Sequence, residues 1–418
     1  MVEQKIRKGY KQTELGIIPE DWETKKIKHI GNVIRGASPR PKGDKRFYGG
    51  EVPRLMVEDV TRDGKFVIPK VDFLTKEGEK RSRPCKKGTL TVVCSGTVGI
   101  PSFLAIDACI HDGFLAITNI HKNISEDYLY HQLSNLRNKF EISATHGGVF
   151  TNLTTTILEE FEVAFPPTKD EQFIIANILS DIDTLIDSIE SLIQKKKNIK
   201  QGAMQELLTG KRRLEGFSGK WKEKEFGSLT TLLTNGFVGK VKDHYVNYDN
   251  GVLYVQGYNV EENDFNFHGI KRVSHLFNKN HKKSQLELGD LLTIQTGEIG
   301  VSATVTPELV GANCHALIIS RLKQDQADPR FYCNYFNSKL GRDKLKEIET
   351  GTTMKHLNVG DLTKLIVPYP ELKEQNAISE IFQHIDVEIK KLENQLNKYT
   401  NLKQAMMQKL LTGEIRLI

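Results

Sequence analysis

The sequence is poor in features that mark secreted and metal-binding proteins. Its 5 cysteines are Cys85, Cys94, Cys109, Cys314 and Cys333. They are odd in number, widely spaced and include no Cys-x-x-Cys pair, which predicts reduced thiols in a cytoplasmic protein. Cys109 and His111 lie close together, but two such residues on one strand are usually only neighbours. The sequence therefore predicts neither a disulfide framework nor a metal site.

Long apolar runs are absent as well. No run approaches the ~20 residues that a membrane-spanning helix needs. The first ten residues are charged and lack an apolar stretch, so we expect no signal peptide. A hydrophobic fraction of 38% still supports packed cores, and 418 residues allow two or three domains. The formal net charge of +6 is only mildly basic, so the location of the charges matters more than their sum.

Motifs for catalysis are missing too. There is no GxxxxGK[ST] phosphate loop, because Gly210-Lys211 is followed by Arg212. There is no Asn/Asp-Pro-Pro-aromatic segment of the kind that holds a flipped adenine, since Pro166-Pro167 follows Phe165. We find no glycine-rich turn for a methyl-donor cofactor and no nuclease-like cluster of Asp, Glu and Lys. The sequence predicts a non-catalytic chain with no cofactor of its own.

What the sequence does contain is an internal repeat. The segment 200–210, ending Gln-Glu-Leu-Leu-Thr-Gly, recurs as segment 403–413, ending Gln-Lys-Leu-Leu-Thr-Gly. At this offset of 203, 21 of the 50 positions from Phe165 to Leu214 are identical, where chance gives about three. Weaker matches upstream pair Trp22 with Trp221. The chain is therefore a duplication, in the order domain, helix, domain, helix.

Each repeat ends in a long helix. Apolar residues step by four and three from Ile175 to Ile193, and again from Ile378 to Tyr399, which is the heptad pattern of a coiled coil. Residues 172–208 are predicted as one helix of ~55 Å at ~1.5 Å per residue. Gly210 and Gly413 are expected to end the two helices.

The order of the parts predicts the topology. The first helix leaves the first domain and ends near the second, so a second helix that packs on it must run back. The helices are then antiparallel, the domains lie at opposite ends of a rod, and the C-terminus returns towards the N-terminus. The alternatives are a generic spacer or dimerisation through the seam.

We expect both globular domains to be α/β. Strands are predicted at 89–94, 114–117, 291–294 and 317–319, and helices at 126–140 and 329–348. The predicted fold is thus two α/β domains related by a pseudo-two-fold axis and joined by two long antiparallel coiled-coil helices. The domain boundaries are 1–165 and 211–368 for the globular domains, and 166–210 and 369–418 for the helices.

Positive charge is concentrated in loops of both domains, which suits contact with DNA phosphates. One run alone would be an ordinary solvated loop, but matching runs in duplicated domains favour DNA. The predicted DNA-binding cations are Arg35, Arg40, Lys42, Lys45, Arg46, Lys80, Arg81 and Arg83, followed in the second domain by Lys240, Lys242, Lys279, Lys282 and Lys283.

Equivalent glycine-flanked loops offer polar side chains for reading bases. Loop 146–152 of the first domain is equivalent to loop 350–356 of the second, and loop 95–97 is equivalent to loop 296–298. Glycine allows a close backbone approach, although a tight turn between strands is the simpler role for these glycines. The predicted DNA-binding residues are Thr97, His146, Thr151, Asn152, Thr296, Thr352, Thr353, Lys355 and His356.

The repeated helix ending suggests a repeated protein partner, because a spacer does not require the same sequence twice. The predicted partner-binding residues are Gln201, Met204, Leu207, Leu208, Gln404, Met407, Leu410 and Leu411.

Segment 10–22, reading YKQTELGIIPEDW, closely resembles the opening of specificity subunits of type I restriction-modification systems. Segment 215–221, EGFSGKW, and both helix endings resemble theirs too. The likeness covers essentially the whole chain. It is specific at the domain entries and helices, and low inside the two domains, which vary within this family.

The resemblance implies that each globular domain is a target recognition domain that reads one half of a two-part site in double-stranded DNA. It also implies that the helices set the unread spacer and bind two modification subunits, which methylate adenine with S-adenosylmethionine. Two restriction subunits, which use ATP and magnesium, would add cleavage. The alternatives are a specificity module for a fused methyltransferase-nuclease, a non-catalytic coiled-coil adaptor, and an enzyme with an unfamiliar site.

Overall fold

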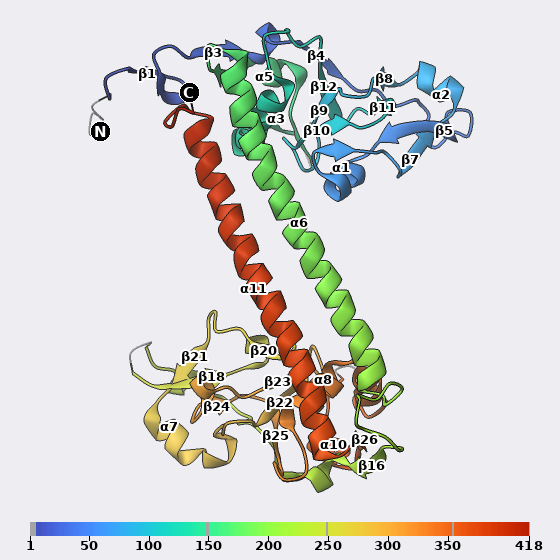
Figure 1. Cartoon of the computed structure of the whole chain (residues 1–418), viewed down its shortest axis with the longest axis vertical. Coiled ribbons are helices and arrows are strands. Elements are labelled where there is room, and N and C mark those ends of the chain that lie inside the picture. The colour runs from blue at the N-terminus through green and yellow to red at the C-terminus, as the bar shows by residue number, and fades with distance from the viewer. Residues whose placement is uncertain (1–5, 148–149, 248–249, 353–354, 418) are drawn as a thin grey trace. The chain divides into compact units, whose positions relative to one another are not determined.

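The computed structural model describes residues 6–147, 150–247, 250–352 and 355–417. The chain forms two compact units, each of which contains one globular domain and part of both long helices (Figure 1). Unit 1 comprises residues 1–189 and 395–418, and unit 2 comprises residues 190–394. Within the described ranges, no helix has both the length and the apolar character needed to cross a bilayer.

Unit 1 is built around two sheets, with strand orders β4-β12-β9-β10-β6 and β7-β5-β11-β8. Its elements are β1 Tyr10–Thr13, β2 Gly16–Pro19, β3 Glu23–Lys26, β4 Asn32–Arg35, β5 Tyr48–Leu55, α1 Val57–Asp63, β6 Phe66–Val67, β7 Asp72–Leu74, α2 Lys76–Lys80, β8 Arg83–Cys85, β9 Leu90–Val93, β10 Pro101–Leu104, β11 Ala108–Ile110, β12 Phe114–Thr118, α3 Glu126–Asn135, α4 Arg137–Ser143, β13 Thr145–Gly147, β14 Phe150–Asn152, α5 Thr155–Glu160 and β15 Glu162–Phe165.

Unit 2 repeats this plan with smaller sheets, ordered β17-β25-β22-β23 and β21-β18-β24. Its elements are β16 Lys222–Glu225, β17 Thr230–Asn235, β18 Val252–Val255, β19 Val260–Glu261, β20 Asp264–Phe265, β21 Lys271–Val273, α7 His275–Asn280, β22 Leu291–Ile294, β23 Ser302–Thr304, β24 Asn313–Cys314, β25 Leu317–Leu322, α8 Pro329–Asn337, α9 Lys339–Glu347, α10 Val359–Lys364 and β26 Ile366–Tyr369.

The first sheet of each unit is buried on both faces. In unit 1, Leu90 and Val92 of β9 pack in the core shared with the helices, whereas Val93 packs in a second core with the other sheet. In unit 2, Leu291 of β22 packs in the core shared with the helices, and Leu292 packs in a second core with the other sheet. Burial on both faces explains why these strands are continuous apolar runs, and the four predicted strands are confirmed.

The helices that follow these sheets are shorter than predicted. The sequence predicts one helix at 126–140 and one at 329–348, but the structure breaks each into two, at Leu136 and at Ser338. Ser338 has an extended backbone and its hydroxyl accepts a hydrogen bond from the amide of Gly341, so it caps α9. A Cβ on Gly341 would lie 1.9 Å from the carbonyl oxygen of Tyr335, and this close approach of the backbone requires glycine.

The two long helices are α6 Lys169–Leu207 and α11 Leu372–Leu410. They pack antiparallel within each unit, as predicted. Asp183 pairs with Lys403 at 2.5 Å in unit 1, and the equivalent residues Asp386 and Lys200 pair at 2.5 Å in unit 2. Along the predicted seam, Ile175, Leu179 and Ile378 are fully buried.

A second repeated ion pair, which we call the closing pair, joins the start of one long helix to the segment after the other. In unit 1, Arg416 donates to both oxygens of Glu171 at 2.5 and 2.8 Å. In unit 2, Arg213 does the same to Glu374 at 2.6 and 2.7 Å. Both glutamate side chains are 1% exposed. The closing pairs therefore hold a buried carboxylate in each unit.

Both ends of the described chain meet in unit 1. The hydroxyl of Tyr10 donates to the carbonyl oxygen of Gly413 at 3.1 Å. Gly413 has φ +69°, and a Cβ there would lie 2.6 Å from Pro19. Gly210 has φ +68° and packs in the same way on Trp221. The predicted glycine helix ends and the return of the chain are thus confirmed.

Candidate nucleic-acid interface

The structure brings the two basic runs of unit 1 together. The sheet β7-β5-β11-β8 and helix α2 together form what we call lobe 1. The loop after β4, residues 36–47, lies on this lobe. The hydroxyl of Ser82 donates to the carbonyl of Ala37 at 2.7 Å, and Arg83 donates to the carbonyl of Arg35 at 3.2 Å. The hydroxyl of Thr75 donates to the carbonyl of Arg46. Segments 35–46 and 80–87 therefore form one surface.

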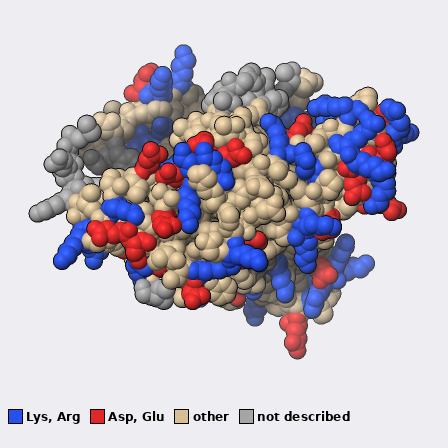
Figure 2. Space-filling view, turned by 90° about the horizontal axis from the view of Figure 1, so that it is seen from above, with Lys and Arg blue, Asp and Glu red and all other residues tan. Residues whose placement is uncertain are grey.

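An aromatic ring lies between the two runs. Phe47 is 2% exposed, and the guanidinium groups of Arg46 and Arg81 lie 5.2 and 4.7 Å from its ring centroid. These contacts hold the cations of both runs on one side of lobe 1. Figure 2 shows Lys and Arg side chains gathered at the right-hand edge, over the part of unit 1 where Figure 1 places α2, β5 and β8.

All eight predicted cations of lobe 1 are exposed. Three of them also make ion pairs: Arg46 with Asp44 at 2.7 Å, Arg40 with Asp112 at 3.5 Å, and Arg81 with Glu77 at 3.5 Å. Hydrogen bonds from Arg46 lower the pKa of Asp44 below its usual value. Such exposed pairs contribute little stability, so a phosphate can replace the carboxylate as the partner of these cations.

Unit 2 repeats the arrangement. Its sheet β21-β18-β24 with α7 forms lobe 2, and the loop 236–245 after β17 lies on it. Phe237 lies 5.0 Å from Phe277 and 4.6 Å from His281, measured between ring centroids. Lys240 and Lys242 are thereby carried on the same lobe as α7 and the turn after it. The five lysines predicted in unit 2 are exposed.

A glycine begins each basic loop. The amide of Gly36 donates to the carbonyl of Phe114 at 2.9 Å, and the amide of Gly236 donates to that of Leu317 at 2.7 Å. A Cβ at Gly36 would lie 2.1 Å from a backbone oxygen, and one at Gly236 would lie 2.5 Å from the sulfur of Cys314. Glycine is therefore required where each loop leaves its strand.

The glycine-flanked loops are also brought together in pairs. Ser95 bridges Asn152 in unit 1, and Thr296 bridges His356 in unit 2. Gly96 and Gly297 have φ +79° and +83° with open space around them, which is the tight-turn role. The side chains of Thr97, Thr296, Thr352 and Lys355 are exposed, and Lys355 pairs with Glu349 at 3.3 Å. His146 and Thr151 belong to β13 and β14, but their side chains and the whole of Thr353 lie outside the described residues.

The turn between β11 and β12 joins the loops to the basic surface. The amide of Cys94 donates to the carbonyl of Gly113 at 2.8 Å, next to the loop 95–97. On the other side, the carboxylate of Asp112 accepts from Ser38 at 2.5 Å. Although burial opposes it, the hydrogen bond from Ser38 lowers the pKa of Asp112. The two predicted groups of DNA-binding residues in unit 1 are thus adjacent.

Four of the predicted partner-binding residues have a different role. Leu207 and Leu208 pack in the core of unit 2, and Leu410 and Leu411 pack in the core of unit 1, with exposures of 7% or less. This part of the prediction is corrected, since apolar side chains at the last helical turn close a core here. Gln201 and Gln404 are exposed and Met204 and Met407 are half-buried, so a candidate docking surface remains.

The structure adds residues that the sequence analysis missed. Arg54, Asp72 and Asp112 join the basic loop of unit 1 to lobe 1. None of them belongs to a basic run. In the sequence, Arg54 could have been noticed because it is a charged residue in an otherwise apolar strand end, Val-Pro-Arg-Leu.

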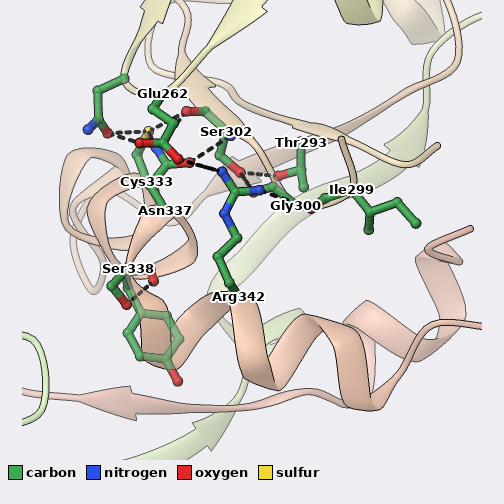
Figure 3. A network of polar contacts seen from close by, with 11 residues as sticks. Glu262, Thr293, Ile299, Gly300, Ser302, Cys333, Asn337, Ser338 and Arg342 are labelled. Carbon is green, nitrogen blue, oxygen red and sulfur yellow. Dashed lines mark hydrogen bonds and ion pairs between the residues drawn. The ribbon is translucent and has the colours of Figure 1, made fainter. Parts of the chain in front are cut away.

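Unit 2 also contains a groove of about 1450 Å³ beside α6, α8 and α11. Most of its charged side chains are held in ion pairs, as in Lys390 with Asp264 at 3.1 Å. Figure 3 shows Arg342 at its wall, donating to Glu262 at 3.1 Å, to Asn337 at 3.2 Å and to the carbonyl of Ile299 at 2.9 Å. Because these groups satisfy one another, we assign the network to holding α8 and α9 on the sheet.

Exposed cations of lobe 1 give a direct test of DNA contact. Replacing Arg81 by alanine is expected to weaken DNA binding and to reduce the slope of log affinity against log salt by about 1, because one phosphate contact is lost. Titration of labelled duplex DNA at several salt concentrations measures this slope. Lys398→Ala, an exposed cation on α11, is the matched control. An unchanged slope for Arg81→Ala would remove this residue from the interface.

Comparison with known proteins agrees with this geometry. The family model described as the type I restriction modification DNA specificity domain matches twice, over residues 19–201 and 219–399. Each match spans one globular domain with one long helix, which is the repeat found in the sequence.

Relatives match over nearly their whole length. A putative type I restriction enzyme specificity subunit, MjaX, from Methanocaldococcus jannaschii is 26% identical over 98% of this chain and 97% of its own. The EcoKI specificity subunit of Escherichia coli is 24% identical, over 96% and 90%. The solved S subunit from M. genitalium has a TM-score of 0.62 at 16% identity, over 97% and 98%. The chain therefore belongs to the DNA specificity subunits of type I restriction-modification systems.

Proposed function

We propose that this chain selects the DNA sequence on which a type I restriction-modification complex acts, and that it catalyses no reaction itself. The observation that carries the proposal is the repeated arrangement of a basic loop on a basic lobe. It occurs once in each unit, with exposed cations in both. Each unit would read one half of a two-part site in duplex DNA. Phosphate contacts would hold the lobe in place, and side chains at the glycine-flanked loops would contact base edges.

The long helices are the proposed site for partner subunits. Gln201 with Met204, and Gln404 with Met407, present the same side chains on both helix endings. A duplicated surface suits two copies of one partner. We infer that two modification subunits bind there and methylate adenine with S-adenosylmethionine, and that two restriction subunits add ATP- and magnesium-dependent cleavage. The proposed location is the cytoplasm, where DNA is accessible.

The test is methylation mapping by long-read sequencing, in cells that carry this chain together with a modification subunit from the same system. An adenine-methylated motif in two parts, separated by an unread gap, is the expected result. Half-sites about one helical turn apart, ~34 Å, suit two domains that contact one face of DNA. Cells that carry the modification subunit alone are the control. If the complex assembles and no new methylation appears, the chain is an adaptor and the proposal fails.

A further inference from the structure

Lobe 1 contains an arginine, Arg54, whose charged side chain is buried and not exposed at the surface. Arg54 lies in β5 and is 5% exposed, in contrast to the exposed cations of the basic loop. Its guanidinium group donates to Asp72 at 2.6 Å and to the hydroxyl of Ser38 at 3.4 Å. Ser38 in turn donates to Asp112 at 2.5 Å. We call Ser38, Arg54, Asp72 and Asp112 the loop clasp.

The loop clasp holds both ends of the segment that carries the cations. Ser38 stands at the start of this segment. At its other end, the ring of Tyr48 lies 5.2 Å from the guanidinium of Arg54, and the Tyr48 hydroxyl donates to the carbonyl of Pro39 at 2.8 Å. Residues 40–46 lie between these two anchors and include Arg40, Lys42, Lys45 and Arg46. One buried side chain therefore contacts both ends of the DNA-binding loop.

Unit 2 holds its loop by different chemistry. In lobe 1, the parallel strands β5 and β11 pair Arg54 with Cys109 and Leu55 with Ile110. In lobe 2, the parallel strands β18 and β24 pair Tyr254 with Asn313 and Val255 with Cys314. Tyr254 therefore has the same position in its strand pair as Arg54. The hydroxyl of Tyr254 lies 3.1 Å from His315, and its ring centroid lies 5.8 Å from that of Phe277. Phe277 packs on Phe237 of the loop. Aromatic packing in lobe 2 replaces the ionic contacts of lobe 1.

We propose that Arg54 is a positioning residue for recognition of the first half-site. The inference rests on the proposed function, since it concerns the loop that we assign to DNA. Recognition requires side chains to be held within a fraction of an ångström of the right geometry by the residues behind them. Without the guanidinium, Ser38 and Tyr48 lose their shared partner and the loop takes several conformations. Ser38 then no longer fixes Asp112, which lies in the turn that is bonded to Cys94 beside the proposed base-reading loop 95–97, so that loop is placed less firmly as well. The first half-site is then read less strictly, whereas unit 2 still reads the second.

The experiment compares methylation maps of the complete complex formed with wild-type chain, Arg54→Met, Arg54→Lys and Ser38→Ala. Methionine keeps an unbranched, flexible apolar stem and removes the charged guanidinium group. For Arg54→Met we expect methylation of sites mismatched in the first half to rise about 10-fold or more relative to matched sites, since a well-placed base contact is worth ~1–3 kcal/mol. Selectivity at the second half should not change. Arg54→Lys should restore part of the selectivity, because lysine can pair with Asp72 but has no fork to reach Ser38 as well.

Tyr254→Phe is the matched control in lobe 2, because it removes one hydroxyl and leaves reading of the first half-site intact. If the complex with Arg54→Met methylates no DNA, the test rests on the complex with Ser38→Ala. This variant removes a contact of the loop without leaving a cavity in the core. A relaxed first half-site in Ser38→Ala supports the inference. An unchanged site in Ser38→Ala, or in an active Arg54→Met complex, overturns it. If the wild-type complex itself methylates no two-part site, the proposed function has failed instead.

Discussion

Replacing Arg416 by alanine is expected to lower the free energy of unfolding of unit 1 by about 3–5 kcal/mol. Arg416 donates to both oxygens of Glu171, whose side chain is 1% exposed, and it also pairs with Asp21 at 2.9 Å. The substitution leaves the Glu171 carboxylate buried without its partner. Removal of one member of a buried ion pair is costly because the remaining charge has lost its hydration and gained nothing in return.

Arg213→Ala provides the matched variant, because it breaks the equivalent closing pair with Glu374 in unit 2. Thermal unfolding, followed by a spectroscopic probe placed in each unit, should show that each variant destabilises mainly its own unit. The double variant Arg416→Ala with Glu171→Leu should recover part of the loss, since no charge is then left buried. A loss below about 1 kcal/mol for Arg416→Ala would show that water reaches Glu171.

Exchanging residues 25–165 for those of a relative is expected to replace the first half-site completely and to leave the second half-site unchanged. The exchanged segment contains lobe 1, its basic loop and the glycine-flanked loops of unit 1, and it contains no residue of unit 2. Its two ends lie beside each other, because Lys25 pairs with Val163 across β3 and β15. Methylation at the original site should fall about 10³-fold or more, the usual ratio of specific to non-specific DNA binding.

Methylation mapping of the chimaeric complex reads both halves at once. The reciprocal exchange of residues 225–367 is the control, and it should change only the second half-site. The donor must keep apolar residues where unit 1 packs on Ile175 and Leu179 of α6, because these contacts form part of its core. A chimaera that changes both halves would mean that the two units do not read DNA independently.

The sequence predicts the long helices well because their pattern is repeated and dictated by burial. Asp183 and Lys200 recur as Asp386 and Lys403, and each aspartate pairs with the lysine of the other helix. The breaks at Leu136 and Ser338 are harder to predict. Leu136 is itself a favourable helix residue, and the break at Ser338 depends on the close approach of Gly341 to Tyr335.

The candidate interface was predictable in part, because duplication is informative here as well. Basic runs are visible in a sequence, and loops equivalent by duplication can be matched to one another. The loop clasp is not visible, since Ser38, Arg54, Asp72 and Asp112 are far apart in the chain and meet only through the register of β5 with β7 and β11. The helix endings were misread because repetition marks both a docking surface and a repeated core.

The division of unit 1 between two stretches of chain has a consequence for biosynthesis. Every residue of unit 2 leaves the ribosome before residues 395–418, so unit 2 can begin folding while translation continues. Unit 1 cannot complete its fold at that stage, because Lys403, Leu410 and Arg416 complete its helix pair, its core and its closing pair. Its first 189 residues must wait with an apolar helix face uncovered. A premature stop after residue 394 would therefore disable the unit encoded first and spare the unit encoded second.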